Sequence, residues 1–301
     1  MSAASAVRGL PGETAEPAVR AALPAIVFTL VLSILPVGLM LFYSFMKAAP
    51  YGGVEPVFSL DAYVSLLFRR DLFSGELAFS ADHLVIFGRT VFFAALTTFL
   101  CFVLGFPTAW FMAMQPPARR KWWVLAITIP FWTSLLVRTL ALMIIISDGG
   151  VINGVLLGAG LVHQPVVMLY TDFAVGLGLV YSFLPFMILP LYSSLSKFDM
   201  RLLEAGADLY AGRWRILSRI VLPAIRPGIA SGVLLVFLPA LGAYVVPLIL
   251  GGGASMMIGD LIALQFGSAR NWPLGAAQST VMTLAVVAVL VVFRKLEGKR
   301  A

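Results

Sequence analysis

Long apolar runs, separated by short polar segments, are the main pattern of this sequence. Six runs are long enough to cross a bilayer as helices, at about 22–46, 84–114, 122–146, 167–195, 228–250 and 274–293. A run of roughly 18 or more apolar residues is typical of a transmembrane helix, because a helix rises about 1.5 Å per residue across a hydrocarbon core of ~30 Å. The pattern therefore predicts an all-α, polytopic membrane protein with six transmembrane helices.

The composition supports a membrane location. Hydrophobic residues make up 60% of the chain and charged residues 12%, whereas soluble domains carry about 25% charged residues. We expect one transmembrane domain over 22–295, short tails at 1–21 and 296–301, and no separate soluble domain. The first apolar run is too long for the core of a signal peptide and lacks a clear cleavage site, so we expect it to be retained.

Basic residues indicate the orientation. They gather in 115–121, in the 196–227 loop and at the C-terminus, which six spans would place on one side, while 147–166 and 251–273 are nearly free of Lys and Arg. Cytoplasmic loops of membrane proteins carry the Lys/Arg excess, so both termini should be cytoplasmic. The net charge of +7 is thus an orientation signal. A nucleic-acid partner is not expected, because no soluble module carries a basic stripe with interleaved aromatic residues.

The sequence lacks the polar constellations of an enzyme. It contains no phosphate-binding loop and no hydrolase nucleophile motif. Its single cysteine, Cys101, lies inside the second apolar run, and His83 and His163 are isolated. We therefore expect no catalytic residue, no metal site and no cofactor bound by this chain, and we interpret Cys101 as a packing residue.

Arg138 is an unusual charge, because it lies inside the third predicted span. Counting about 1.5 Å per residue from Trp122 places it about six ångströms beyond the midpoint, toward the outside. An ionisable residue at that depth is a functional-site hypothesis and needs a partner or water. The alternative is an arginine that reaches the outer headgroups. Asp148 and Asp172, near the outer ends of spans three and four, are the expected partners.

Spans four and five contain two prolines each, which favours helices that bend around a pathway, although proline and glycine are also simply common in membrane helices. The aromatic residues of these two spans are further candidates for lining such a pathway, although aromatic residues in membrane helices more often face lipid or a neighbouring helix. The candidate translocation-path residues are Arg138, Asp148, Asp172, Tyr181, Phe183, Phe237 and Tyr244.

A polar, basic segment between spans four and five has the amphipathic pattern of two short helices. An apolar stripe that includes Leu209 and Tyr210 lies beside a face of mixed charge, and Gly212 is expected to divide the run. Basic amphipathic helices can lie on a bilayer. The acids Glu204 and Asp208 on the polar face instead favour a helix seated in a protein groove.

The spacing of Glu204-Ala205, Ile220 and Leu222-Pro223 resembles the cytoplasmic loop of bacterial ABC importer permeases. That motif reads Glu-Ala-Ala, three residues, Gly, nine residues, Ile-x-Leu-Pro. Here Gly206 replaces the second Ala and Tyr210 the Gly, so Gly212 becomes the expected terminator of the first helix. The resemblance implies that an ATPase subunit contacts this loop. The implied coupling-loop residues are Glu204, Ala205, Gly206, Asp208, Leu209, Tyr210, Gly212, Ile220, Leu222 and Pro223.

Four further segments resemble the first-permease subunits of spermidine/putrescine importers: 130–139, 170–174, 181–190 and 271–275. This resemblance implies the type I permease fold in a bacterial inner membrane. It also implies a second permease subunit, an ABC ATPase dimer that binds ATP and Mg, and a periplasmic solute-binding protein as partners, besides membrane lipid.

The resemblance predicts a polyamine substrate, but related permeases carry opines, aminoethylphosphonate or amino-acid-like solutes. Arg138 would repel a cation unless it is paired. A different class, the ion-coupled secondary transporter, needs intramembrane carboxylates or histidines and often inverted repeats. The centres of these spans hold no carboxylate, and no repeat is visible. A membrane scaffold without transport is a third reading. Copurification with an ATPase would favour the importer permease, and uptake that persists after ATP depletion would favour the secondary transporter. Reconstitution tests whether the protein is a scaffold without transport.

The topology can be tested with single cysteines in a Cys101→Ser background. A membrane-impermeant thiol reagent added from outside should modify Glu76→Cys and leave Arg213→Cys unmodified, because the Lys/Arg excess places the 196–227 loop inside. The reverse labelling pattern would contradict the orientation and with it the contact of the loop with an ATPase.

Overall fold

A computed structural model describes residues 15–70, 77–253 and 255–298. The chain divides into two compact units, one formed by the segments up to Val64 and from Arg270, the other by Ser65–Ala269. Parts of the predicted tails, 1–14 and 299–301, lie outside the described residues, as does Glu76. The two units are treated separately below.

The first unit pairs two long helices, α1 (Ala15–Ser44) and α14 (Trp272–Gly298). Its hairpin joins β1 (Met46–Ala48) to antiparallel β2 (Val54–Phe58), and α2 (Asp61–Val64) follows. The Leu23–Ser44 part of α1 is apolar, and nearly all of its side chains are exposed. Such a surface is suited to lipid or to another membrane helix.

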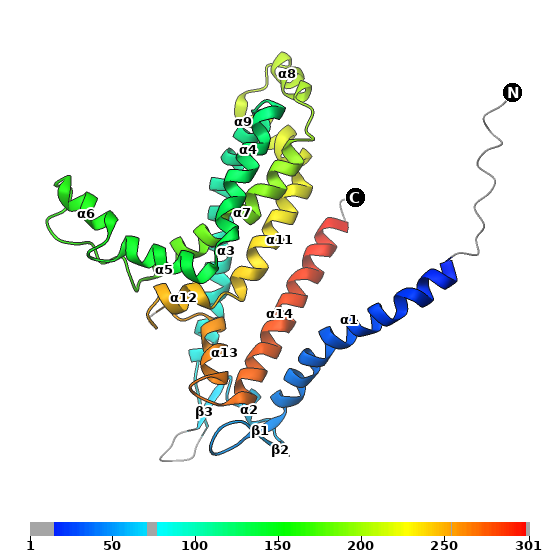
Figure 1. Cartoon of the computed structure of the whole chain (residues 1–301), viewed down its shortest axis with the longest axis vertical. Coiled ribbons are helices and arrows are strands. Elements are labelled where there is room, and N and C mark those ends of the chain that lie inside the picture. Colours follow the sequence, from blue (N-terminus) through cyan, green and yellow to red (C-terminus); the bar gives the residue numbers. More distant parts are fainter. Residues whose placement is uncertain (1–14, 71–76, 254, 299–301) are drawn as a thin grey trace. The chain divides into compact units, whose positions relative to one another are not determined.

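The second unit is built on three helices that pack side by side: α3 (Asp82–Met114), α7 (Asp172–Leu195) and α11 (Arg226–Leu241) (Figure 1). A small hairpin of β3 (Phe68–Arg70) and β4 (Leu77–Phe79) precedes them. The apolar faces of α3, α7 and α11 meet in one buried core, which we call the central core. Its buried members are Cys101, Ala109, Met112, Ala113, Val180, Met187, Ile188, Leu191, Leu195, Val221, Ile225 and Val236.

The third predicted span, 122–146, is not one helix. Helix α4 (Pro117–Thr128) runs into the short 3₁₀ helix η2 (Ile129–Trp132), and α5 (Leu135–Ile146) starts after Thr133, which is extended, and Ser134. Pro130 explains the break, because it lacks the N–H that continues an α-helix and its ring crowds the preceding turn. A count of 1.5 Å per residue from Trp122 to Arg138 therefore does not hold across this break, and the depth predicted for Arg138 loses that basis.

The fifth predicted span is also interrupted. Helix α11 ends at Leu241, and α12 (Val245–Leu250) starts after a break of three residues. Two short helices occupy the segments expected to be outer loops, α6 (Val151–Gly158) and α13 (Ile258–Phe266). By contrast, the fourth predicted span is one helix, α7, that continues through both of its prolines.

The described residues contain five stretches that are long and apolar enough to cross a membrane, and a sixth if one bent pair of helices counts as a span. The bent pair is Arg213–Ala224 with Arg226–Leu241, at an angle of 72°. The number of spans predicted from the sequence thus holds, while two of the predicted spans differ in where their helices begin and end.

Helices α7 and α11 lie in close contact at Gly228. A Cβ atom added there would lie 2.7 Å from the carbonyl oxygen of Pro190 and would also collide with the Ser194 side chain. The backbone of α7 cannot yield as a side-chain end can, so this position requires glycine for steric reasons.

We expect Gly228→Ala to lower the thermal unfolding temperature of the purified protein in detergent, because overpacking a close helix contact costs about 1–3 kcal/mol. Gly154→Ala is the matched control, since a Cβ on that glycine of α6 meets no atom within 4 Å. Equal unfolding temperatures for the two variants would contradict the packing described here.

Candidate functional site

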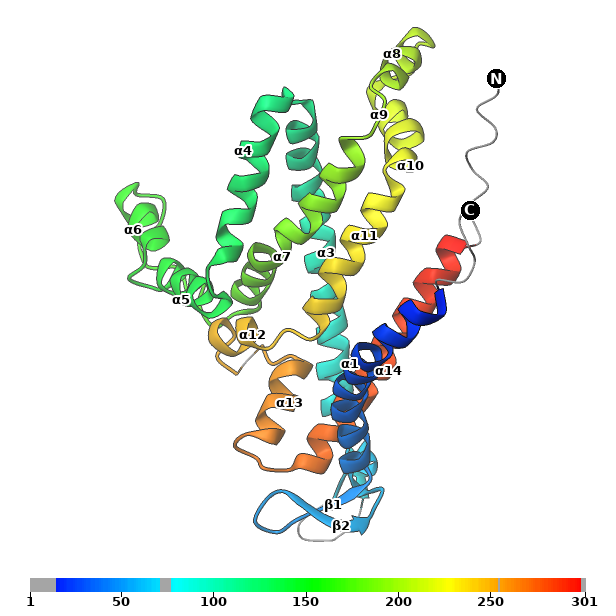
Figure 2. The ribbon, with the colours of Figure 1, turned by 45° about the vertical axis from the view of Figure 1, so that its right-hand side comes forward.

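The predicted coupling loop folds as four short helical segments between α7 and α11. They are α8 (Arg201–Asp208), α9 (Arg213–Ile216), the π-helical turn η3 (Leu217–Val221) and α10 (Leu222–Ala224). Figure 2 shows α8 and α9 at the end of α7 and α11 that lies opposite α12 and α13. The division of the segment into two short helices near Gly212 agrees with the sequence pattern.

The end of α8 differs from the prediction. The N–H of Ala211 bonds the carbonyl oxygen of Gly206 at 3.1 Å, and that of Tyr210 bonds Ala207 at 2.9 Å. These two bonds form a Schellman motif, with Tyr210 at its left-handed position at a φ of 53°. Gly212, with a φ of −64°, instead starts α9. Tyr210, and not Gly212, therefore terminates α8, and a tyrosine holds a conformation that glycine adopts with less strain.

Gly206 faces the interior of the loop. A Cβ atom on it would lie 2.9 Å from Cδ1 of Ile220 and 3.3 Å from Cγ1 of Ile216. The small residue thus lets α8 close onto the segment that follows it. Ile220 from the predicted motif supports α8 from inside, so neither Gly206 nor Ile220 belongs to the outer surface of the loop.

The outer surface of the loop combines acidic and aromatic side chains. Glu204, Ala205 and Asp208 are exposed on α8, and beyond it the exposed fractions are 82% for Leu209 and 97% for Tyr210. Trp214 on α9 is 77% exposed. The sequence analysis missed Trp214, although a tryptophan in a basic amphipathic segment was a signal for it. Large exposed apolar side chains of this kind are typical of a protein–protein contact.

The inner surface of the loop is part of the central core. Leu203, Ile216 and Leu217 pack against that core, and Val221 and Ile225 are buried within it. Leu222 is partly buried, and Pro223 lies in the first turn of α10, where a proline costs no helical hydrogen bond. Because interiors are close-packed, a displacement of the loop must also displace α7 and α11.

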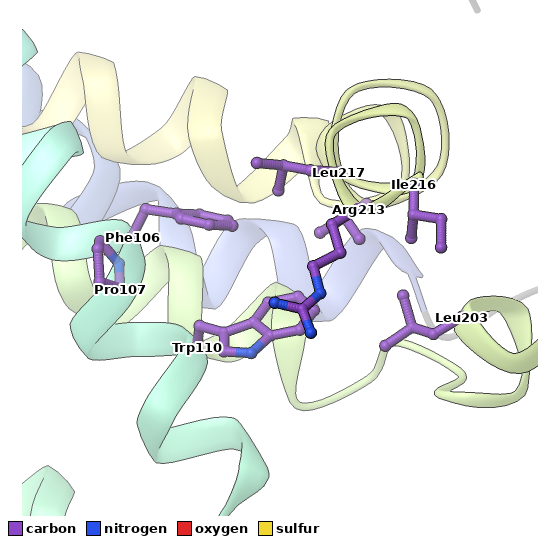
Figure 3. A pocket seen from close by; sticks show the side chains of 8 residues that line it. Phe106, Pro107, Trp110, Leu203, Arg213, Ile216 and Leu217 are labelled. Atoms are coloured by element: carbon purple, nitrogen blue, oxygen red, sulfur yellow. The ribbon is translucent and has the colours of Figure 1, made fainter. Parts of the chain in front are cut away.

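A hollow of about 460 Å³ lies between the loop and the C-terminal half of α3. Phe106, Pro107 and Trp110 of α3 form one wall, and Leu203 and Arg213 belong to the other (Figure 3). Its lining is mainly apolar.

Arg138 lies among aromatic rings. Its guanidinium carbon is 5.4 Å from the centre of the Phe131 ring, and Phe131 meets Phe186 edge to face at 4.8 Å. Phe183, a predicted path residue, is 6.3 Å from Phe186. The buried Nε of Arg138 has no hydrogen-bond partner among the described residues. These contacts come from η2, α5 and α7, so the break at Pro130 brings an arginine and three phenylalanines together.

Asp172 has a different partner from the one expected. Nη2 of Arg89 lies 3.1 and 3.2 Å from its two carboxylate oxygens, and the Ser255 hydroxyl donates to Oδ1. Among the described residues, no ion pair joins Arg138 to Asp148 or Asp172. The predicted pairing of Asp172 with Arg138 was therefore wrong. Arg89 was missed, although a lone arginine inside the second apolar run is the same signal that singled out Arg138.

One polar contact joins α13 to α3 near this pair, and a second caps the start of α13. The N–H of Ile258 donates to the Thr90 hydroxyl at 2.9 Å, and the N–H of Met257 donates to Oδ2 of Asp260 at 3.0 Å. Asp260 is buried, and this burial raises the pKa of its carboxyl to about 6. The segment that starts α13 is thus anchored beside Asp172 and Arg89.

The remaining path candidates do not form one cluster. Asp148 is exposed in the turn after α5, Tyr181 is exposed on α7, and Phe237 is partly buried on α11. Tyr244 stands at the break between α11 and α12 and is half exposed. Within the described residues, no group of three or more His, Cys, Asp or Glu side chains could hold a metal ion.

Sequence comparison matches residues 82–297 to the family described as "Binding-protein-dependent transport system inner membrane component". Among curated proteins, the chain is 39% identical over 250 residues to the spermidine/putrescine transport system permease protein PotB of Escherichia coli (strain K12), covering 83% of this chain and 86% of that protein. It is 32% identical over 222 residues to the inner membrane ABC transporter permease protein YdcU of the same organism, covering 70% of each.

Structural comparison finds the same fold in a bacterial ABC transporter involved in the import of the acidic polysaccharide alginate. The TM-score is 0.70 over 94% of this chain and 95% of that chain, at 17% sequence identity. A second structure of a bacterial alginate ABC transporter, in complex with a pentasaccharide-bound periplasmic protein, matches with a TM-score of 0.67. At this identity the likeness concerns the fold and not the substrate.

The position of Gly206 leads to a test of the loop. We expect Gly206→Leu to push α8 away from Ile220 and to speed tryptic cleavage after Arg213 and Arg215 in the purified protein, because the added side chain has no space. Ala205→Leu is the matched control, since Ala205 is exposed one residue earlier. Equal cleavage rates in both variants would show that Gly206 is not packed as described.

Proposed function

We propose, because this chain belongs to the family of binding-protein-dependent transport system inner membrane components, that it is the permease subunit of an ATP-driven importer and carries a polyamine into the cytoplasm. The chain is a multi-pass inner-membrane protein with the fold of ABC importer permeases. ATP hydrolysis is assigned to a separate subunit that binds ATP and Mg.

The geometry of the coupling loop carries this proposal. Its outer surface offers Glu204, Leu209 and Tyr210 to a partner, while its inner surface continues into the central core. A push on α8 by the ATPase dimer therefore reaches α7 and α11 through side chains in direct contact. A secondary transporter has no need for such a loop, and this observation favours the ATP-driven class.

The substrate proposal comes from the relatives. The spermidine/putrescine permeases are the most extensive curated matches described above, with coverage of more than four fifths of both chains. We infer that the substrate is spermidine, putrescine or a similar small polyamine. The alternative is another small solute, such as an opine, aminoethylphosphonate or an amino-acid-like molecule, because a second inner-membrane permease is also similar.

The proposed complex contains a second homologous permease, an ABC ATPase dimer and a periplasmic solute-binding protein. A structural neighbour bound to its periplasmic protein supports the last of these partners. The termini and the coupling loop are placed in the cytoplasm because of their basic residues. Arg138, with Phe183, is proposed to face the translocation path, since the buried Nε of Arg138 needs water or a partner that the described residues do not provide.

The function can be tested with the complex reconstituted in proteoliposomes. ATP inside the vesicles and spermidine-loaded binding protein outside should give spermidine uptake that continues when ion gradients are dissipated. Uptake that instead follows an ion gradient without ATP would contradict the importer class. Uptake of a different solute only would contradict the polyamine assignment and leave the class intact.

Glu204→Lys tests the coupling role within the same assay. The charge reversal on the exposed face of α8 should weaken ATPase association and abolish substrate-stimulated hydrolysis, because like charges at an interface cost several kcal/mol. Glu204→Gln should give an intermediate effect, since it removes the charge without reversing it. Wild-type pull-down, stimulation and uptake in the lysine variant would refute the coupling role of Glu204.

A further inference from the structure

The hollow between the coupling loop and α3 is apolar apart from one basic side chain. Its lining residues are Phe106, Pro107, Trp110, Leu203, Arg213, Ile216, Leu217 and Val221. The ring centres of Phe106 and Trp110 are 6.0 Å apart, so the wall that α3 contributes is largely aromatic. At about 460 Å³ the hollow lies within the ~300–1,000 Å³ that is usual for a small-molecule site.

Arg213 supplies the charge of the hollow. Figure 3 shows its side chain extending from α9 toward Trp110. Among the described residues, Arg213 forms no ion pair, and no acid lines the hollow. A guanidinium stays protonated in proteins, so a negative group at this point is attracted without competing with a carboxylate of the chain. The lining therefore favours an anion with a long apolar part.

Neighbouring side chains indicate that the hollow lies at a membrane surface. Trp122 and Trp123 follow the basic residues 119–121 in α4, and Trp214 follows Arg213 in α9. All three indoles are exposed, and Figure 2 shows α9 and the first turns of α4 toward the same end of the helices. Tryptophan and basic residues are both enriched where helices leave a bilayer. A phospholipid is the long-chain anion that such a surface supplies.

We propose that this hollow binds an anionic phospholipid. One acyl chain lies along Phe106 and Leu217, where it meets apolar surface on both walls. The phosphate group contacts Arg213, which is exposed to solvent. Trp110 lies between these two parts of the lipid, and its amphipathic ring suits the boundary between chain and headgroup. The lipid site is distinct from the ATPase contact and from the translocation path proposed above.

A lipid at this position links the bilayer to the coupling loop. Ile216 and Leu217 line the hollow and also pack against the central core. The loop shares that core with α7 and α11, so an acyl chain between the loop and α3 adds a contact to one close-packed body. The lipid composition of the bilayer is therefore expected to influence how easily the loop moves.

The fluorescence of Trp110 reports whether the hollow is occupied. The assembled complex is reconstituted in phosphatidylcholine vesicles with increasing fractions of a phosphatidylglycerol whose acyl chains carry bromine, which quenches nearby tryptophans. The difference between the wild type and Trp110→Phe isolates the signal of Trp110. We expect half-maximal quenching of Trp110 at a mole fraction about fivefold lower than with brominated phosphatidylcholine, since one basic group near an anionic lipid contributes about this factor.

Two arginine variants separate a specific site from the general attraction of anionic lipid to a basic surface. Arg213→Gln should remove the preference of the Trp110 signal for phosphatidylglycerol. Arg215→Gln is the matched control, because Arg215 is exposed on the same helix and is not among the residues that line the hollow, so this variant should keep the preference. Equal losses in the two variants would mean unspecific attraction and would overturn the site.

Three other results would also contradict the lipid site. Equal quenching by the two brominated lipids would show that the headgroup is not recognised. Absence of Trp110 quenching by either lipid would show that another subunit of the complex covers the hollow. Relief of the quenching by glycerol 3-phosphate, which has the phosphate but no acyl chain, would show that the chain contributes nothing. None of these measurements depends on solute uptake, so the proposed function stands or falls separately.

Discussion

The close-packed apolar core shared by α3, α7, α11 and the coupling loop is the interaction on which the rest of the second unit depends. Met187, Leu191 and Leu195 of α7 are fully buried in it, and Ile225, at the end of the loop, is buried in it as well. Interiors packed to this density transmit displacement, because no free volume absorbs it. Because its inner side chains are part of this core, the loop between α7 and α11 is packed as one body with these helices.

Helix α7 connects the two sites of chemical interest. Asp172, its first residue, holds the ion pair with Arg89, and Leu195, its last, lies in the core beneath the loop. At about 1.5 Å per residue, a helix of 24 residues spans ~36 Å, which exceeds the hydrocarbon core. A shift of α7 driven from the loop would thus reach Asp172 at the other end of this helix.

The breaks in the helices are placed by local sequence, such as Pro130, and their freed backbone groups still need hydrogen-bond partners. Irregular backbone at membrane depth persists only where protein or a water-lined cavity satisfies its polar groups. The 129–134 break brings Arg138 of α5 beside aromatic rings, and Tyr244 lies in the 242–244 break. Polar chemistry therefore gathers where the helices are interrupted.

The sequence by itself predicted the apolar spans, the clustering of basic residues and the family motif of the loop, because apolar length, charge bias and motif spacing are local properties. It could not place Gly206 against Ile220, identify Tyr210 as the left-handed end of α8, or pair Asp172 with Arg89 across 83 residues. Those features depend on which helix faces pack together. Only the tertiary structure decides them, since partners distant in the chain compete for the same charge or the same space.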